Sequence, residues 1–329
     1  MDSSGLVAIA VKGWWRLALR KLGELIATLL VASFVVFGSM YLAPGKPIDF
    51  LIQGRSPTPE QIAAIKAQYG LDKPFFMQYL NWLWGVLHGD FGRSFQFRQD
   101  VGSLIASRLP TTILLVVMSA LLITIFGMIA GIVGSLNAGK LADKAVLVCV
   151  TILAAIPSFV AAILLISVFA VRLGWFPTFG AGKGFFDQIY HLTLPAIALS
   201  LTFIALLGRV TRTSMLDELS REHVEVATSR GVKRRTVVRK HVLRNSLGPI
   251  STISALLIAG LLVSSAVVET AFGLNGIGSL LVQSVDKLDF PIVQAIVLLV
   301  VAVFVIINAI VDLLQPLIDP RTAAGVSAR

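Results

Sequence analysis

The chain has 329 residues, of which 56% are hydrophobic and only 14% are charged, and its mean hydropathy is +0.85. An ordinary globular protein has about 45–50% apolar and about 25% charged residues, so the composition excludes a pair of soluble domains and indicates an integral membrane protein. The 28 basic and 18 acidic residues leave a net charge of +10. Either nucleic acid or an anionic membrane surface could attract such a charge, so the positions of the basic residues matter.

Six segments without Asp, Glu, Lys or Arg are long enough to cross a bilayer, which takes about 20 apolar residues in a helix. None of them alternates between apolar and polar residues as a strand of a membrane barrel does. We therefore predict an all-α integral membrane protein with six transmembrane helices. The segments are 25–45, 111–139, 145–171, 188–208, 245–268 and 290–311.

The first apolar segment follows a basic N-terminal stretch, as the core of a cleaved signal peptide would. Its apolar part is longer than a usual signal core, and the sequence Pro44-Gly45-Lys46-Pro47 is a poor cleavage site. We therefore expect a retained membrane anchor, preceded by a cytoplasmic segment of residues 1–21.

Residues 43–110 are expected to form a helical module outside the membrane. Thr58-Pro59-Glu60-Gln61 is a capping box with proline at the first helical position, and the helix is predicted to end near Gly70. A second helix is expected over the aromatic segment 75–89, which is too short to span the membrane and suits its interface. The pattern alone does not distinguish a partner-binding module from a solvated cap.

Three glycines, Gly127, Gly131 and Gly134, recur on one side of the second apolar segment. Small residues at this spacing let two membrane helices approach closely, so we expect a tight helix contact there.

The sequence of Gly134–Leu141 nearly matches a phosphate-binding loop. It has leucine in place of the Ser or Thr that binds magnesium, and an apolar helix leads into it. We therefore expect no ATP hydrolysis by this chain.

The basic residues concentrate in one short loop. Residues 208–247 contain ten Lys or Arg and four Asp or Glu, which accounts for six of the ten net positive charges. Short loops rich in Lys and Arg stay in the cytoplasm, so the predicted topology has both termini on the cytoplasmic side. Membrane orientation thus accounts for much of the charge without nucleic acid.

The same loop is predicted to contain two helices. Ser220 is a candidate N-cap for the first helix, and Gly231 is placed to end it. Val224, Ala227 and Thr228 fall on one face at helical spacing, and a basic helix then runs from Lys233–Arg235 to about residue 243. Such a short amphipathic helix could enter a groove of another protein or could contact lipid. Composition leaves both possibilities open.

The chain offers few groups for chemistry. It has a single cysteine, Cys149, and its four histidines are scattered over different loops, so we predict no disulfide within the chain and no metal site. Ion-coupled carriers usually keep ionisable residues at mid-membrane, whereas Glu24, Glu269 and Asp312 fall near the ends of the spans. Energy for uphill transport would then have to come from a partner.

The loop motif Glu225-Val-Ala-Thr-Ser-Arg-Gly231 resembles the EAA loop of ABC importer permeases. Further motifs resemble the peptide and nickel branch of that family, and together they extend in order from about Arg20 to Arg321. Val226 departs from the alanine that is usual at its position. The additional motifs are 69–74 with 78–79, 89–94, 233–235 with 240–245, 268–273 with 276–278, and 319–321.

This resemblance implies a transmembrane permease domain over residues 22–329, with an extracytoplasmic module at 43–110 and a cytoplasmic coupling loop at 208–247. It implies residence in the cytoplasmic membrane of a prokaryote. The implied partners are a second homologous permease subunit, two ABC ATPase subunits or domains, an extracytoplasmic solute-binding protein and membrane lipid, but no nucleic acid. ATP and magnesium would bind the ATPases, and this chain would hold no cofactor and no catalytic residue.

By the same resemblance, the helix at 221–231 would couple the permease to an ATPase. Glu225 would pair with a basic residue of the ATPase, and Ala227 and Gly231 would permit close approach. The coupling residues are Val224, Glu225, Ala227, Thr228, Arg230 and Gly231.

The residues that line the translocation pathway are predicted on polarity and size alone. Glu269 could line its outer mouth or anchor the next loop. The candidates are Ser200, Thr202, Ser264, Ser265 and Glu269.

The expected substrates are oligopeptides or dipeptides. Nickel or another small solute such as glutathione is the alternative within the family, and an ion-coupled carrier or a membrane scaffold without transport are the alternatives outside it.

Overall fold

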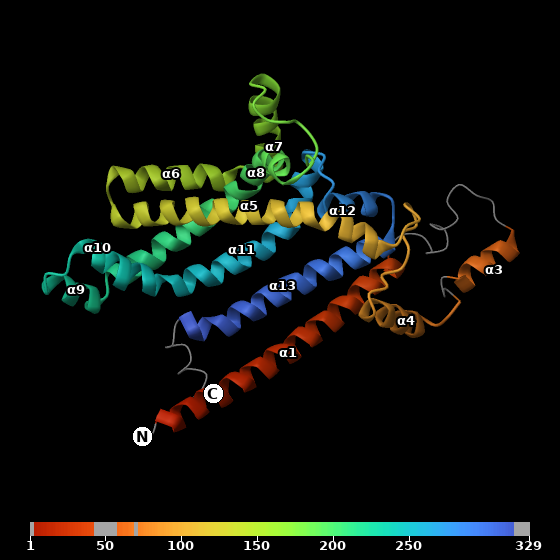
Figure 1. Ribbon diagram of the computed structural model, residues 1–329, viewed down its shortest axis with the longest axis horizontal. Helices are drawn as coiled ribbons and strands as arrows, with labels where there is room; N and C mark the ends of the chain where they lie inside the picture. Colours follow the sequence, from red (N-terminus) through yellow and green to blue (C-terminus); the bar gives the residue numbers. More distant parts are fainter. Residues whose placement is uncertain (1–2, 43–57, 69–71, 319–329) are drawn as a thin grey trace.

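A computed structural model describes residues 3–42, 58–68 and 72–318, with side chains described for residues 19–42, 58–63 and 72–311. Within these ranges the chain is helical, and the only pairing of extended backbone is an isolated bridge between Arg93 and Asp100. This confirms the predicted all-α class. Figure 1 shows long helices that run lengthwise through the molecule, with short helices gathered at both ends.

Five of the predicted spans each correspond to one long apolar helix. In the bundle, α5 packs against α8, and α11 packs against both α8 and α13, while α1 lies at the edge against α13. The main apolar core fills the space between α5, α8 and α11. The five helices are α1 (Ser3–Leu42), α5 (Val101–Leu136), α8 (Phe185–Leu219), α11 (Arg244–Ala271) and α13 (Phe290–Ile318).

The third predicted span, residues 145–171, is not one straight helix. Helix α6 (Leu141–Ala155) stops in the middle of the apolar segment, and the chain turns by 96° into α7 (Ser158–Leu165), which continues as a π-helix, η1 (Ile166–Arg172). Pro157 supplies the break, because proline lacks an amide donor and forces Ile156 before it into an extended conformation. The prediction of six spans therefore holds only if this bent pair counts as one span.

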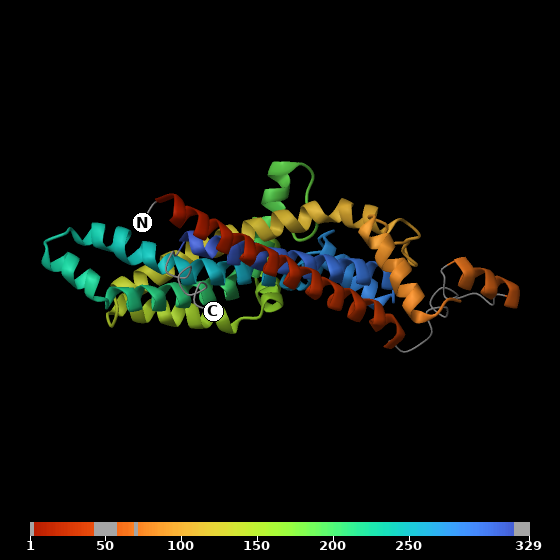
Figure 2. The ribbon, with the colours of Figure 1, turned by 90° about the horizontal axis from the view of Figure 1, so that it is seen from below.

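One end of the bundle carries the predicted outer module. Thr58 and Gln61 form the predicted capping box at the start of α3 (Pro59–Gln68), with each backbone amide donating to the other side chain. Helix α4 (Phe75–Leu87) packs on α1 through the rings of Phe37 and Tyr79. A further short helix, α12 (Ile277–Asp286), joins α11 to α13 at this end (Figure 2). The predicted helix end at Gly70 and the segment 44–47 lie outside the described residues.

The opposite end carries the basic segment. Helix α9 (Glu222–Ser229) follows α8, and α10 (Arg234–Val237) continues through the π-helical turn η2 (Val238–Leu243) directly into α11. Figure 1 places the start of α1 and the end of α13 at this same end. The arrangement agrees with termini on one side of the membrane, and which side is cytoplasmic stays a prediction.

The predicted glycine contact is confirmed, and its partner is α8. Gly127, Gly131 and Gly134 are buried along α5 where it meets α8. A Cβ added at Gly131 would lie 2.4 Å from the Thr211 Cβ and 2.9 Å from the backbone nitrogen of Arg212. Since the obstruction includes backbone, a side-chain rotation cannot relieve it. We call this contact the glycine seam.

We predict that Gly131→Ala lowers the midpoint of thermal unfolding, because the added methyl group overpacks the glycine seam at a cost of about 1–3 kcal/mol. The control is Gly38→Ala in α1, where a Cβ meets nothing within 4 Å and the better helix propensity of alanine should leave stability equal or higher. Circular dichroism of the two variants in the same detergent measures the difference. Equal midpoints would contradict a close contact at residue 131.

Candidate functional site

The first candidate site is α9, the helix that bears the EAA-like motif. Arg221 occupies its N-cap position, and no side chain caps the helix. The predicted N-cap, Ser220, instead follows the last residue of α8, and its hydroxyl donates to the carbonyl oxygen of Asp217 at 2.8 Å. The predicted N-cap is wrong by one residue, because Ser220 completes the last turn of α8.

The C-terminal end of α9 is fixed by Gly231, as predicted. The Gly231 amide donates to the Thr228 carbonyl at 3.0 Å, and the Val232 amide donates to the Ala227 carbonyl at 3.2 Å. These two bonds define a Schellman motif, which needs a left-handed residue after the helix, and Gly231 has φ +73°. An added Cβ would meet nothing within 4 Å. The left-handed backbone conformation therefore explains why residue 231 is a glycine, since there is space for a side chain within this chain.

The apolar face of α9 turns inward. Val224 and Ala227 are buried in a cluster that includes Met215 from α8, Val237 from α10 and Val242 from η2. These two residues, which the sequence assigns to coupling, contact the core of their own chain. They can serve a partner only indirectly, by fixing the position of α9.

Glu218 joins the three helices at this end of the bundle. Its buried carboxylate accepts a hydrogen bond from the Asn245 amide at 2.8 Å, at the start of α11. The same carboxylate lies 3.0 Å from Arg221 Nε and 3.1 Å from His223 Nε2, at the start of α9. Sequence reasoning missed this role, since a glutamate near a helix end has many ordinary explanations. The consequence is that α9 is tied to two spanning helices at once.

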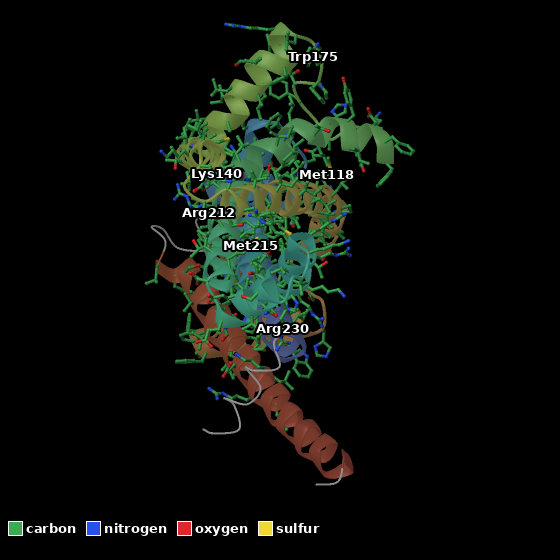
Figure 3. All side chains as sticks on the ribbon, turned by 90° about the vertical axis from the view of Figure 1, so that its left-hand side faces the viewer. Met118, Lys140, Trp175, Arg212, Met215 and Arg230 are labelled. Carbon is green, nitrogen blue, oxygen red and sulfur yellow. The ribbon has the colours of Figure 1, made fainter. Side chains whose placement is uncertain are left out.

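The outward face of α9 carries the remaining coupling candidates. Glu225, Thr228, Arg230 and Gly231 are exposed, and the Thr228 hydroxyl donates to the Val224 carbonyl at 2.8 Å. Figure 3 shows Arg230 well apart from Met215 in the core. Val226, which departs from the family alanine, is 48% exposed on this face. The outward face therefore offers one apolar side chain between charged ones.

A second ion pair lies close to the glycine seam. Arg212 of α8 makes a two-pronged contact with Asp143 of α6, with Nε at 2.7 Å and Nη2 at 2.8 Å from the carboxylate oxygens. The Gly139 amide donates to the same carboxylate at 2.9 Å. Gly134 leaves room for the Arg212 side chain, because a Cβ there would lie 3.1 Å from its Cδ. The pair ties the start of α6 to α8, and the sequence did not reveal it.

Most of the predicted pathway hydroxyls bond to nearby backbone. Ser200 and Ser265 are buried, and each donates to the carbonyl of the residue three positions earlier. Thr202 of α8 is partly buried and reaches across to the carbonyl of Ile156 at 3.3 Å, at the break between α6 and α7. Ser264 is also partly buried. The assignment of these residues to a pathway stays a prediction.

Glu269 is completely buried near the C-terminal end of α11. Its carboxylate accepts hydrogen bonds from the Thr112 hydroxyl of α5 at 2.6 Å and from the Ser279 amide of α12 at 2.9 Å. A Cβ at Gly276 would lie 2.3 Å from one of its oxygens, so glycine is required for the loop to pass. Of the two roles considered for Glu269, these contacts are those of a loop anchor.

A second buried acid, Asp289, holds residues 94–96 of the predicted outer module in the same way. Its carboxylate, just before α13, accepts hydrogen bonds from the Ser94 hydroxyl and from the amides of Phe95 at 3.1 Å and Gln96 at 3.0 Å. The residues held include Ser94, the last residue of the predicted motif 89–94. No sequence pattern indicated this contact, because Ser94 and Asp289 lie 195 positions apart.

The bundle also contains an apolar cleft of about 630 Å³ between α5, α6 and α8. Its lining includes Phe126, Ile129, Cys149 and Leu201, together with Ser200, whose hydroxyl already bonds to backbone. This lining offers little to a polar solute. No group of three or more His, Cys, Asp or Glu side chains suited to a metal ion occurs among the described residues.

Two family models match the chain. Residues 15–116 match the N-terminal part of the membrane component of binding-protein-dependent transport systems, and residues 123–324 match the binding-protein-dependent transport system inner membrane component. The chain belongs to this permease family. It is therefore a multi-pass protein of the inner membrane and a component of a transport system, as the motifs predicted.

Relatives within the permease family extend over nearly the whole chain. A putative peptide transport system permease protein of Brucella abortus is 37% identical over 309 residues, which cover 93% of this chain and 98% of the relative. The glutathione transport system permease protein GsiC of Salmonella choleraesuis is 38% identical over 302 residues, covering 92% and 97%.

Solved structures of an ABC transporter contain a chain with the same fold. A chain of the inward-facing methionine ABC transporter MetNI superposes with a TM-score of 0.54 at 19% identity, covering 65% of this chain and 96% of that chain. A second crystal form of the same transporter gives a TM-score of 0.53 at 16% identity. At this identity the likeness supports the fold alone.

We predict that Glu218→Gln loosens α9 in this permease, because the neutral amide loses the ion pair with Arg221, worth about 1 kcal/mol. The matched control is Asp217→Asn, one residue earlier and exposed. Hydrogen exchange followed by mass spectrometry should show faster exchange in α9 for Glu218→Gln only. The same exchange in both variants would argue against the connecting role of Glu218.

A further prediction concerns Asp289→Ala, which leaves three donors of the outer loop without their acceptor, at about 1–3 kcal/mol for each buried group. The expected result is a lower unfolding midpoint together with faster proteolysis of the 89–100 segment. Asp286→Ala removes an exposed acid three residues away and should change neither measurement. A normal proteolysis pattern in Asp289→Ala would show that other contacts hold the loop.

Proposed function

We propose that this chain is the permease subunit of an ATP-driven importer for peptides and that α9 couples it to a partner ATPase. The observation that carries the proposal is the way α9 is held by contacts with the rest of the chain. Its inner face is buried against α8, α10 and η2, its outer face is exposed, and Glu218 links it to the ends of two spanning helices. A displacement of a helix held in this way is passed on to the spanning helices α8 and α11.

The outward face suits a groove on another protein. Val226 would enter the groove, while Glu225 would pair with a basic residue of the ATPase at its rim. Closure of the ATPases would then move α9 as a unit with the ends of α8 and α11, and the spans would tilt between inward-facing and outward-facing states. Val224 and Ala227 act in this scheme by holding the helix, and Gly231 by ending it.

The partners follow from the same proposal. Two ABC ATPases would bind ATP and magnesium and perform the hydrolysis, so this chain itself would be non-catalytic. A second homologous permease would complete the pathway, and an extracytoplasmic binding protein would deliver solute to the outer module, which Asp289 fastens to the bundle through residues 94–96.

Peptides are the substrate class that the relatives favour. The printed names of two relatives specify peptide and glutathione transport, and glutathione is itself a small peptide. The nickel alternative has no comparable support among them. Because a separate binding protein would select the solute, the permease would need only a pathway that tolerates peptides.

The test is to purify the transporter through a tag on this chain and to measure the ATPase that comes with it. We expect Glu225→Arg and Val226→Arg each to reduce the co-purified ATPase about tenfold or more, since a charge reversal or a buried charge in the groove costs at least about 1.4 kcal/mol. Asp286→Arg makes the same change at the opposite end of the bundle and should retain the full amount.

Three outcomes would count against the proposal. The first is normal recovery of the ATPase with both α9 variants, which would remove α9 from the interface. The second is peptide uptake by vesicles that contain this chain but no ATPase, which would point to an ion-coupled carrier. If the assembled complex hydrolyses ATP but no solute stimulates it, the chain is a scaffold and not a transporter.

A further inference from the structure

The basic segment that joins α9 to α11 is held in one orientation by its apolar side chains. Helix α10, the π-helical turn η2 and α11 run as one continuous helix from Arg234 to Ala271. In its first turns, Val237 and Val242 are buried in the cluster that contains Met215 of α8. Every exposed residue from 233 to 244 is a lysine or an arginine. The exposed residues are Lys233, Arg234, Arg235, Arg239, Lys240 and Arg244.

Three of these residues gather where the helix enters its apolar part. In a π-helix the backbone hydrogen bond joins residues five positions apart, so η2 places Arg239 and Arg244 on the same side of the helix. Lys240 is four positions before Arg244 and lies next to it. We call Arg239, Lys240 and Arg244 the basic face.

Among the described residues no acid neutralises the basic face. None of its three side chains makes an ion pair or a hydrogen bond within the described part of the chain. Arginines of α8 at the same end of the bundle do have partners. Arg209 donates to the Thr151 hydroxyl at 3.2 Å, and Arg212 forms its ion pair with Asp143. Membrane orientation requires Lys and Arg in this loop, but it does not require them to gather on one side of a helix without acceptors.

The depth of the basic face matches the headgroups of the membrane lipids. The apolar part of α11 begins at residue 245, and a helix rises about 1.5 Å per residue, so the basic face lies within about 9 Å of that point. The headgroup layer on each side of a bilayer is about 5–7 Å thick, and long basic side chains extend along a helix to reach it. Residues 233–235 lie about 15–18 Å from the same point, which is outside the headgroups.

We propose that the basic face binds the phosphate groups of anionic phospholipids in the leaflet on the side of α9. A phospholipid phosphate is anionic, is confined to this depth and accepts hydrogen bonds from arginine and lysine. Groups of Lys and Arg beside a spanning helix attract such lipids. An ATPase would instead meet α9, and residues 233–235 beyond the headgroups. The site goes beyond the proposed function, because it needs neither an ATPase nor a solute.

The test begins with the loss of the basic face. The triple variant Arg239→Gln, Lys240→Gln and Arg244→Gln removes its three charges, and the double variant Arg239→Lys and Arg244→Lys keeps them. Each full-length chain is purified in a neutral detergent, and its thermal unfolding is checked by circular dichroism. Native mass spectrometry then measures the dissociation constant for phosphatidylglycerol, and for phosphatidylcholine with the same acyl chains as the zwitterionic comparison.

The chain supplies a matched control with the same change of charge. The triple variant Lys233→Gln, Arg234→Gln and Arg235→Gln removes three charges from the same loop, outside the headgroup layer. It reproduces any effect of net charge on membrane insertion or on general attraction of anions. Only the depth of the removed charges differs between the two triple variants.

We expect the unmodified chain to bind phosphatidylglycerol at least about tenfold more tightly than phosphatidylcholine. The triple variant of the basic face should lose this preference, whereas the control triple variant and the arginine-to-lysine variant should retain it within about twofold. Binding should weaken as the salt concentration rises, since ions screen exposed charges.

Four results would overturn the proposal. The unmodified chain could show no preference for phosphatidylglycerol, or both triple variants could lose the preference equally, in which case net charge explains it. Inorganic phosphate alone could displace the lipid, which would indicate a site for free phosphate. Finally, loss of the basic face could reduce the co-purified ATPase and leave lipid binding unchanged, which would assign the face to the ATPase interface. The lipid measurements use this chain alone, so their failure is distinct from a failure of the proposed function.

Discussion

The arrangement of this permease depends on the close approach of α5 and α8 at the glycine seam. Without side chains at Gly127, Gly131 and Gly134, α8 can lie directly on α5, and Arg212 comes within reach of Asp143 at the start of α6. In an apolar medium no hydrophobic force drives helices together, so packing of this kind and polar contacts must hold the bundle. The seam also fixes the end of α8, from which Glu218 reaches α9 and α11.

Buried acids at the two ends of the bundle complete this scheme. Asp143 and Glu218 fasten the end that carries α9, and Glu269 and Asp289 fasten the end that carries α12 and the outer loop. A carboxylate can accept several hydrogen bonds at once, so one residue can tie two or three segments together. These acids lie at or near helix ends, and the other buried polar side chains of the described residues are mainly Ser and Thr. The buried acids thus join the helix ends to one another at both ends of the bundle.

The sequence predicted more of the fold than of the site. Apolar length located five straight spans, the capping box located α3, and Gly231 located the end of α9, because each of these features depends on neighbouring residues. The bend at Pro157 and the N-cap of α9 were not predicted, since proline is tolerated inside several other helices here and Ser220 can serve either helix. The apolar face with Val224 and Ala227 could have packed on this chain or on a partner protein. The sequence pattern is the same in both cases, so it did not predict that these residues face inward.

The sequence by itself determined that the chain is a helical membrane protein of the binding-protein-dependent permease family, because hydrophobic length and short motifs are local properties. Only the tertiary structure decided which residues act together. Ser94 meets Asp289, and Thr112 meets Glu269, across long stretches of chain. Such pairings arise when packed helices bring distant segments to the same depth, and no spacing along the chain records that depth. The tertiary structure also turned part of one apolar span sideways at Pro157. Proline lies inside α5, α8 and α11 without such a turn, so the packing of α7 against α8 and α11 holds the turned segment.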